Sequence, residues 1–419
     1  MSRTSAVNAP PGVAAPPRVI AATVLGTVLE WYDFAIYGAL ATMIGKLFFP
    51  SDDPTTSLLI ALASYAVGFV CRPIGSIVLG RFGDRAGRRN MLAITMVVVG
   101  GSSLLIGLLP TYASIGLLAP VLLVLLRMIQ GLAVGAEWTG GATYLIEYAR
   151  TGRRGLFGGV VQASTVVGFL SGTGVATLVI RTDQEWAWRV PFLLGGLVAA
   201  IGLFVRLKLD ESPAYLRVQA EEEVPPGRTR KNWLLLFGIV FGITLYGYTA
   251  TSWPAFLAGV TELPLPDALL TNVIALAVEV PLIVLAGWLS DRVGRRPLMI
   301  GAAAVFTVGT YPMFLLATGG TMAGALVGQL LFVITFAALC GPMAALFVEM
   351  FPTRVRSSAF SSSYNIAVAL FGGTAPFVNT FLATRTGSHV APAYYLTVGA
   401  VVSLVLLATV RDRHREELD

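Results

Sequence analysis

The sequence predicts an all-α integral membrane protein with twelve transmembrane helices arranged as two six-helix bundles. Hydrophobic residues make up 55% of the 419 positions and charged residues only 12%, and the mean hydropathy is +0.76. A chain this apolar has too few polar side chains to form a surface exposed to water, and it is therefore expected to lie in a membrane. The 45 glycines fit closely packed membrane helices, because small residues let transmembrane backbones approach one another.

Long apolar runs identify the individual helices, since a helix needs about 20 apolar residues to cross the bilayer and a barrel strand only about 10. Twelve runs meet this length: 19–48, 56–80, 91–109, 114–148, 155–181, 187–208, 233–260, 268–289, 298–318, 321–349, 358–384 and 392–410. The polar stretch between the sixth and seventh runs divides the chain in half. We expect a disordered cytoplasmic tail (1–18), a first bundle (19–208), a cytoplasmic linker (209–231), a second bundle (232–411) and a second cytoplasmic tail (412–419).

Lysine and arginine positions predict the orientation in the membrane. If both termini are cytoplasmic, the tails and inner loops hold 23 of the 29 basic residues, the outer side holds 4, and Arg72 and Arg127 lie within helices. Because cytoplasmic loops are enriched in lysine and arginine, we expect a multi-pass protein of the plasma (inner) membrane with both termini inside. The net charge of +6 reflects this enrichment, and no nucleic-acid partner is expected.

A ten-residue motif occurs twice. "GRFGDRAGRR" at 80–89 and "GWLSDRVGRR" at 287–296 share the frame Gly-x-x-x-Asp-Arg-x-Gly-Arg-Arg, displaced by 207 residues. A displacement of about half the chain indicates two parallel six-helix repeats. We expect the aspartates to pair with arginines or with a helix end across the interface, as a latch for one conformation; the alternative is a merely topogenic basic turn. The candidate gating residues of the two copies are Asp84, Arg85, Arg88, Asp291, Arg292 and Arg295.

A looser echo joins "IEYARTGRR" at 146–154 to "VEMFPTRVR" at 348–356. Each segment places a glutamate at the inner end of a helix, just before basic residues. This echo again indicates two related halves.

The repeated loops resemble the Major Facilitator Superfamily, and the helix motifs resemble its metabolite:H⁺ symporter family. The residues that carry the resemblance are "LEWYDFAIYG" at 29–38, "CRPIGSIVLGRFGDRAGRR" at 71–89, "RMIQGLAVGAEWTGGATYLIEYARTGRRG" at 127–155, "WAWRVPF" at 186–192 and "EMFPTRVRSSAFSSSYNIAVALFGG" at 349–373. Within this family the chain looks most similar to the proline/betaine transporters, and citrate and 2-oxoglutarate transporters share most of the same motifs. The resemblance implies two bundles that rock around a central site.

Two carboxylates lie in the first apolar segment. Glu30, Asp33, Phe34 and Tyr37 share one helix face at i, i+3, i+4 and i+7. An ionisable side chain inside the membrane is costly and is usually functional. We expect Asp33, together with Glu30, to carry the coupled proton; the alternative is that one of them is neutralised by an arginine on the second or fourth helix.

Arg72 and Arg127 are the corresponding cations. A guanidinium stays protonated and has a planar fork of donors, so we expect Arg127 to hold a substrate carboxylate. Arg72 is expected either to do the same or to act as a structural partner of Glu137 or Asp33. Glu137 is also a candidate partner of Arg127 when the site is empty.

The second half holds one carboxylate near the middle of the membrane, Glu279. Two roles are possible for this side chain: it takes part in coupling, or it forms a hydrogen bond with a polar neighbour. Aromatic side chains of this half suit a quaternary ammonium group through cation–π attraction, although they also serve as packing residues. The candidate substrate-binding residues of the whole chain are Arg127, Tyr37, Gln130, Trp138, Tyr248, Tyr364 and Asn365.

Other chemistry is not expected. The two histidines and two cysteines are too scattered to form a catalytic or metal site, and the Gly-x-x-x-x-Gly-Lys-Ser/Thr phosphate-binding motif is missing from the sequence. We therefore expect no enzyme activity, no cofactor and no metal, and a transporter that functions as a monomer.

Together these features predict a proton-coupled symporter that imports a small carboxylate-bearing metabolite, such as the zwitterionic osmolytes proline or betaine, by alternating access. One alternative is a symporter of di- or tricarboxylates such as 2-oxoglutarate or citrate. A second is a proton-coupled drug exporter, but such antiporters usually carry a Gly-Pro-rich motif in the fifth helix, and 160–181 contains no proline.

Overall fold

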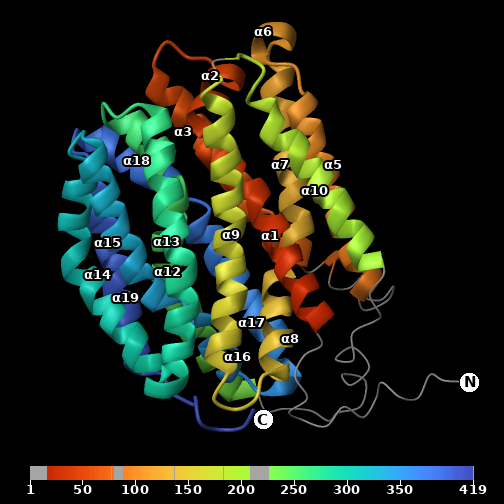
Figure 1. Ribbon diagram of the computed structural model, residues 1–419, viewed down its shortest axis with the longest axis vertical. Helices are drawn as coiled ribbons and strands as arrows, with labels where there is room; N and C mark the ends of the chain where they lie inside the picture. Colours follow the sequence, from red (N-terminus) through yellow and green to blue (C-terminus); the bar gives the residue numbers. More distant parts are fainter. Residues whose placement is uncertain are drawn as a thin grey trace, which may run out of the picture.

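The computed structural model describes residues 17–76, 78–79, 88–135, 137–182, 184–207 and 226–418, and within these ranges every regular element is a helix (Figure 1). Eight described helical stretches are long and apolar enough to cross a membrane. Each of the twelve predicted segments contains a described helix. The predicted tail residues 1–16, linker residues 209–225 and motif residues 80–87 lie outside the described part of the chain.

The first half contains nine helices among its described residues: α1 (Pro17–Ala39), α2 (Ala41–Phe48), α3 (Pro54–Val70), α5 (Arg88–Leu108), α6 (Tyr112–Ile115), α7 (Leu118–Val134), α8 (Glu137–Tyr148), α9 (Arg154–Ile180) and α10 (Arg189–Leu207). Asp53 is the N-cap of α3, because its carboxylate accepts hydrogen bonds from the N–H groups of Thr55 and Thr56.

The described second half contains α12 (Pro226–Val260), α13 (Leu265–Val293), α14 (Arg295–Ala317), α15 (Met322–Cys340), α16 (Met343–Glu349), α17 (Thr353–Ala367), the π-helical turn η2 (Val368–Gly372), α18 (Ala375–Thr386) and α19 (Ala391–Leu407). The start of α12 corrects the predicted linker, because residues 226–231 are helical.

Among the described residues, five of the predicted transmembrane helices are interrupted rather than continuous. The first breaks between α1 and α2, the second at Cys71, the fourth near Gly135, the tenth at Gly341–Pro342 and the eleventh at η2. Pro342 explains one break, since proline cannot donate the N–H that a continuous helix requires. Breaks of this kind at membrane depth are tolerated where the backbone is buried in protein or faces a cavity.

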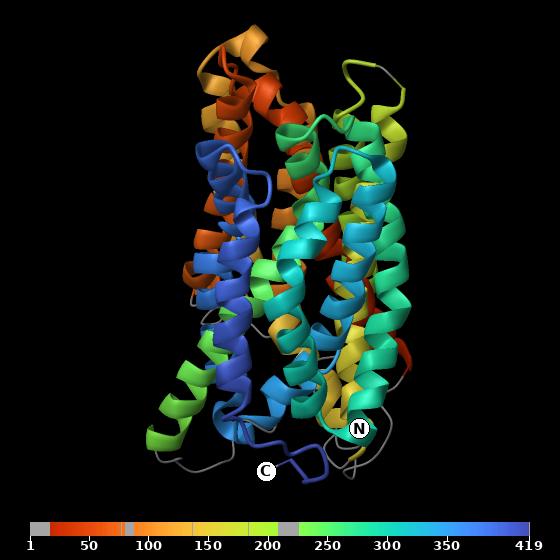
Figure 2. The same cartoon turned by 90° about the vertical axis from the view of Figure 1, so that its left-hand side faces the viewer.

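The two halves lie side by side, and α9 of the first half runs along α13 of the second (Figure 1). Gly155 and Gly287 allow this contact, because a Cβ on either glycine would overlap the carbonyl oxygen of the other. Figure 2 shows the last residues of the chain at the lower end of the molecule, which we call the inner end.

Candidate functional site

Helix α1 carries a buried carboxylate that is paired with an arginine of α7. Asp33 Oδ2 lies 3.4 Å from Arg127 Nη1, and these side chains are 3% and 1% exposed. Gln130 links the two, because its Nε2 donates to Asp33 Oδ2 at 2.8 Å and its Oε1 accepts from Arg127 Nη1 at 2.9 Å. The three side chains form a compact polar cluster, the Asp33 cluster, inside the first half.

Tyr37 completes the Asp33 cluster. Its ring centroid lies 3.7 Å from the guanidinium carbon of Arg127, and its hydroxyl is hydrogen-bonded to the Ser64 hydroxyl. The positive charge is thus held between a carboxylate and an aromatic face, both of which favour a cation.

A second pair lies one turn earlier on α1. Glu30 Oε1 is 3.9 Å from Arg72 Nη2, and the Arg72 guanidinium carbon lies 4.4 Å and 4.3 Å from the ring centroids of Phe34 and Phe69. The described partner of Arg72 is therefore Glu30, whereas the sequence predicted Glu137 or Asp33. Glu137 begins α8, and its side chain lies outside the described part of the structure.

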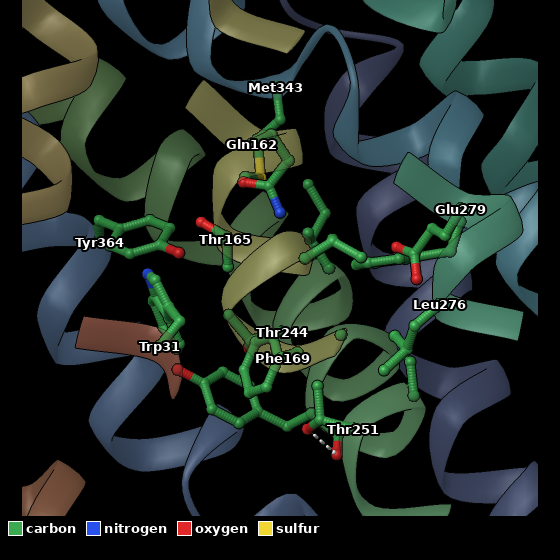
Figure 3. A pocket seen from close by; sticks show the side chains of 16 residues that line it. Trp31, Gln162, Thr165, Phe169, Thr244, Thr251, Leu276, Glu279, Met343 and Tyr364 are labelled. Carbon is green, nitrogen blue, oxygen red and sulfur yellow. Dashed lines mark hydrogen bonds between the residues drawn. The ribbon is translucent and has the colours of Figure 1, made fainter. Parts of the chain in front are cut away.

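A central cavity of about 50 Å³ lies between the two halves (Figure 3). Helices α1 and α9 contribute Trp31, Gln162, Thr165, Val166 and Phe169 to its wall, and α12, α13, α15, α16 and α17 contribute the rest. Of the residues expected at the site, Tyr248, Tyr364 and Glu279 line the cavity. Trp31 and the polar residues of α9 were not expected from the sequence. A signal for the α9 residues would have been the run of polar side chains within an otherwise apolar helix.

Glu279 faces this cavity without a partner among the described residues. The residue is 1% exposed, and neither carboxylate oxygen has a hydrogen-bond partner in the described structure. In Figure 3 it lies across the cavity from Trp31 and Tyr364.

Four other expected binding residues do not line the cavity in this conformation. Arg127, Gln130 and Tyr37 belong to the Asp33 cluster, whereas Trp138 stacks on Tyr364 with ring centroids 4.5 Å apart. Trp138 therefore contacts the cavity wall from behind.

Asn365 also makes a contact between the halves instead of lining the cavity. Its Nδ2 donates to the Gly135 carbonyl oxygen at 2.6 Å. The acceptor lies at the break between α7 and α8, where the carbonyl is released from the regular helix pattern.

Asp291 of the repeated motif binds the N-terminus of a helix in the other half. Its two oxygens accept hydrogen bonds from the N–H groups of Gly155 and Leu156, each at 2.9 Å, and Arg295 lies 2.8 Å from the same carboxylate. A carboxylate at a helix N-terminus satisfies free N–H groups and complements the helix dipole. This is the helix-end contact that the motif predicts.

The other motif residues differ in what the structure describes. Arg292 places its guanidinium carbon 3.9 Å from the ring centroid of Trp288. Asp84 and Arg85 lie outside the described residues, and Arg88 begins α5 with its side chain outside them.

The looser sequence echo forms reciprocal ion pairs at the inner end. Glu147 of the first half lies 2.8 Å from Arg356 of the second, and Glu349 of the second half lies 3.7 Å from Arg154 of the first. Both glutamates and both arginines are separated by the same 202 residues. We call these two pairs, with the Asp291 contact, the inner gate; the equal displacement was a signal in the sequence that could have identified its partners.

The opposite, outer end is closed by apolar side chains. Ala41, Leu58 and Leu62 of the first half form one buried cluster with Ala255 of the second, and Phe377 packs against it. The two ends therefore differ in chemistry, with ionic contacts at the inner end and apolar contacts at the outer end.

Comparison with known proteins identifies the family. The sequence pattern of the family described as "Sugar (and other) transporter" matches residues 19–233 and 233–412. The chain belongs to this transporter family. It is therefore a transporter and not an enzyme, and its fold is the twelve-helix fold of the Major Facilitator Superfamily.

Curated relatives of this transporter cover nearly the whole chain. The proline/betaine transporter of Salmonella typhimurium is 34% identical over 93% of this chain and 82% of its own length. The ectoine/proline transporter ProP of Corynebacterium glutamicum is 34% identical, covering 96% and 86%. The inner membrane metabolite transport protein YhjE of Escherichia coli is 35% identical, covering 95% of both chains.

The fold of the transporter is also found among solved structures. A structure of the proton:xylose symporter XylE, a protein of the Major Facilitator Superfamily, superposes with a TM-score of 0.74 over 94% of this chain and 96% of the other. At 20% identity this likeness concerns the fold.

Proposed function

We propose that this transporter couples the inward movement of protons to the import of a small zwitterionic osmolyte such as proline or glycine betaine. The observation that carries the proposal is the buried Asp33–Arg127 pair, together with a cavity between the two halves that Trp31, on the same helix as Asp33, lines. Support for the substrate class comes from relatives that are named as proline, betaine and ectoine transporters.

The first step is the protonation of Asp33. Neutralising this carboxylate removes the charge that holds Arg127 at 3.4 Å, so that the guanidinium becomes available to a substrate carboxylate. Gln130 bridges the two side chains, and it keeps one partner when the other changes its charge. The proton and the substrate anion thereby depend on the same arginine, which is what coupling requires.

The second step is the movement of one half against the other. The inner gate holds the inner ends together through ion pairs and through Asp291 at the N-terminus of α9. We propose that the loaded protein breaks these contacts while the apolar contacts at the outer end persist, and releases substrate and proton inside.

The available driving force is sufficient for accumulation. A tenfold proton gradient supplies about 1.4 kcal/mol, and 100 mV acting on one net charge supplies about 2.3 kcal/mol. Their sum corresponds to accumulation of several hundredfold for one proton per substrate, since about 1.4 kcal/mol is a factor of ten.

The alternatives have less support. A di- or tricarboxylate would bring two or three negative charges into a cavity that already contains Glu279, and like charges repel strongly at low dielectric. For a drug exporter, nothing in the names of the relatives gives support.

We also propose that both termini are cytoplasmic and that the protein works as a monomer in the plasma (inner) membrane. The C-terminal residues pack against the inner gate, where Arg154 Nη1 donates to the Glu416 carbonyl oxygen at 2.8 Å. This basic end is the one that the distribution of lysine and arginine assigns to the cytoplasm.

The proposal is tested with purified protein in proteoliposomes that contain a pH-sensitive dye. Proline, glycine betaine, 2-oxoglutarate and citrate are added separately outside. We expect proline or glycine betaine to acidify the lumen. Acidification by citrate or 2-oxoglutarate alone would support the dicarboxylate alternative, and no acidification by any solute that the protein takes up would exclude proton symport.

A further inference from the structure

The central cavity has hydrogen-bond donors on one wall and a carboxylate on the opposite wall. One wall carries donors without a partner among the described residues, namely Trp31 Nε1, the Tyr248 hydroxyl and the Thr165 hydroxyl. The other wall carries Glu279, a carboxylate without a described partner. Figure 3 shows Glu279 across the cavity from Trp31.

Glu279 has no arginine to neutralise it within the described structure. Arg72 and Arg127, two of the arginines buried in the first half, are each paired with another carboxylate, Arg72 with Glu30 and Arg127 with Asp33. An isolated carboxylate away from water is costly, by several kcal/mol in real proteins after relaxation. Such a group needs a compensating proton or cation.

The first wall has the opposite character. Tyr248 and Trp31 lie with ring centroids 6.2 Å apart, and Arg72 lies behind them with its guanidinium carbon 5.0 Å from the Trp31 ring. The indole N–H can only donate, and the hydroxyls can donate, so this wall suits the oxygens of a carboxylate.

We propose that Glu279 is the binding group for the positively charged nitrogen of the substrate, on the wall of the cavity opposite Trp31 and Tyr248. The proposal rests on the proposed function and specifies its recognition step: the site selects small solutes with a cation and an anion at opposite ends. Apolar residues, including Leu276, Met343 and Phe336, also line the cavity and suit the methyl groups of a quaternary ammonium or the ring of a cyclic secondary amine.

The experiment compares two ligands of the same shape. Glycine betaine and 3,3-dimethylbutyrate differ in that the cationic nitrogen of the first is a neutral carbon in the second. Affinities are measured by isothermal titration calorimetry on the purified full chain at pH 7. We expect the wild type to prefer glycine betaine by about 10-fold or more, as for a desolvated charge pair.

The key variant is Glu279→Gln, which keeps the shape of the side chain and removes its charge. We expect the preference for glycine betaine to fall to about 3-fold or less, and Glu279→Asp to retain part of it. Glu262→Gln changes an exposed carboxylate and serves as the matched control. Because the buried charge has no described partner, we expect Glu279→Gln to be at least as thermally stable as the wild type without ligand.

Three results would overturn the proposal. In the first, Glu279→Gln keeps the wild-type preference for glycine betaine. In the second, Glu279→Gln loses affinity for both ligands equally. In the third, Glu279→Gln still binds glycine betaine but loses proton-coupled uptake, which would make Glu279 a proton site. The proposed function is read separately, from acidification by the wild type. If the wild type acidifies the lumen with glycine betaine while Glu279→Gln keeps the wild-type preference, only this inference fails.

Discussion

Arg127 Nη1 lies 3.4 Å from Asp33 Oδ2 in the interior of the first half, with Gln130 hydrogen-bonded to both. Both charges come from helices whose other residues are mostly apolar. Burying a charged pair stabilises a protein little and often less than apolar packing would. A role in coupling protons to substrate therefore explains this pair better than a contribution to the stability of the fold does.

Arg127→Gln tests the role of the arginine. We expect this variant to lose glycine betaine binding by about 10-fold or more, because the charge-assisted contact to the substrate carboxylate is removed. Binding is measured by calorimetry on protein with wild-type elution in gel filtration. Arg385→Gln, an exposed arginine at the outer end, is the control. Wild-type affinity in Arg127→Gln would place the carboxylate entirely on other donors.

Gly287→Ala tests the helix contact between the halves. A Cβ at this position would lie 3.0 Å from the Cα of Gly159 and closer still to the Gly155 carbonyl oxygen. Overpacking of this kind costs about 1–3 kcal/mol, so we expect a lower melting temperature in detergent. Gly301→Ala is the matched control, because a Cβ at Gly301 meets no atom within 4 Å. Equal melting temperatures for both variants would contradict the close contact.

Asp291→Ala tests the inner gate. The variant removes the acceptor of two hydrogen bonds from the N-terminus of α9, which should open the inner end more often. Ala345→Cys is introduced as a labelling site after Cys71 and Cys340 have been replaced by serine. We expect this cysteine to react about tenfold faster with a water-soluble thiol reagent when Asp291→Ala is also present than when Asp291 is intact, if Asp291→Ala weakens the closed state by about 1.4 kcal/mol. Asp267→Ala, at the opposite end of the same helix, should leave the rate unchanged. Unchanged labelling in Asp291→Ala would separate this contact from gating.

Asp53 gives a pH-dependent prediction outside the membrane. Hydrogen bonds from the Thr56 hydroxyl and from the N–H groups of Thr55 and Thr56 hold the pKa of the Asp53 carboxyl below its usual range. A lowered pKa contributes stability above the unfolded value of about 3.9, and this contribution is lost as the pH falls through the native pKa. Asp53→Asn should therefore melt slightly below the wild type at pH 7, and this difference should shrink at pH 3. Asp52→Asn is the control, and a difference that grows toward pH 3 would contradict the assignment.

Much of the fold could be predicted from hydropathy and from the 207-residue repeat, because both depend on long segments. The interruptions of the helices could not be predicted this way. Hydropathy averages over a whole span, whereas the break near Gly135, whose carbonyl oxygen accepts from Asn365 of the other half, and the π-helical turn at 368–372 are local features of a few residues.

The candidate site could be predicted only in part. Charges inside apolar segments identified Asp33, Arg127 and Glu279 as unusual, since such positions carry a cost wherever the helices lie. Trp31 gave no such signal, and Thr165 gave only the weaker one of a polar side chain in an apolar helix, because their place on the cavity wall depends on how α1 and α9 pack against the second half. Which arginine pairs with which carboxylate also depends on this packing.

Asp33→Asn in proteoliposomes tests most sharply whether Asp33 couples protons to transport. Accumulation of glycine betaine is measured under an imposed pH gradient. Exchange of labelled for unlabelled glycine betaine is measured without a gradient. Wild-type protein at equal density in the vesicles is the reference for both assays. The coupling role of Asp33 predicts that the variant loses gradient-driven accumulation and retains exchange. Accumulation at the wild-type level by Asp33→Asn would contradict it and would leave Asp33 as a structural partner of Arg127.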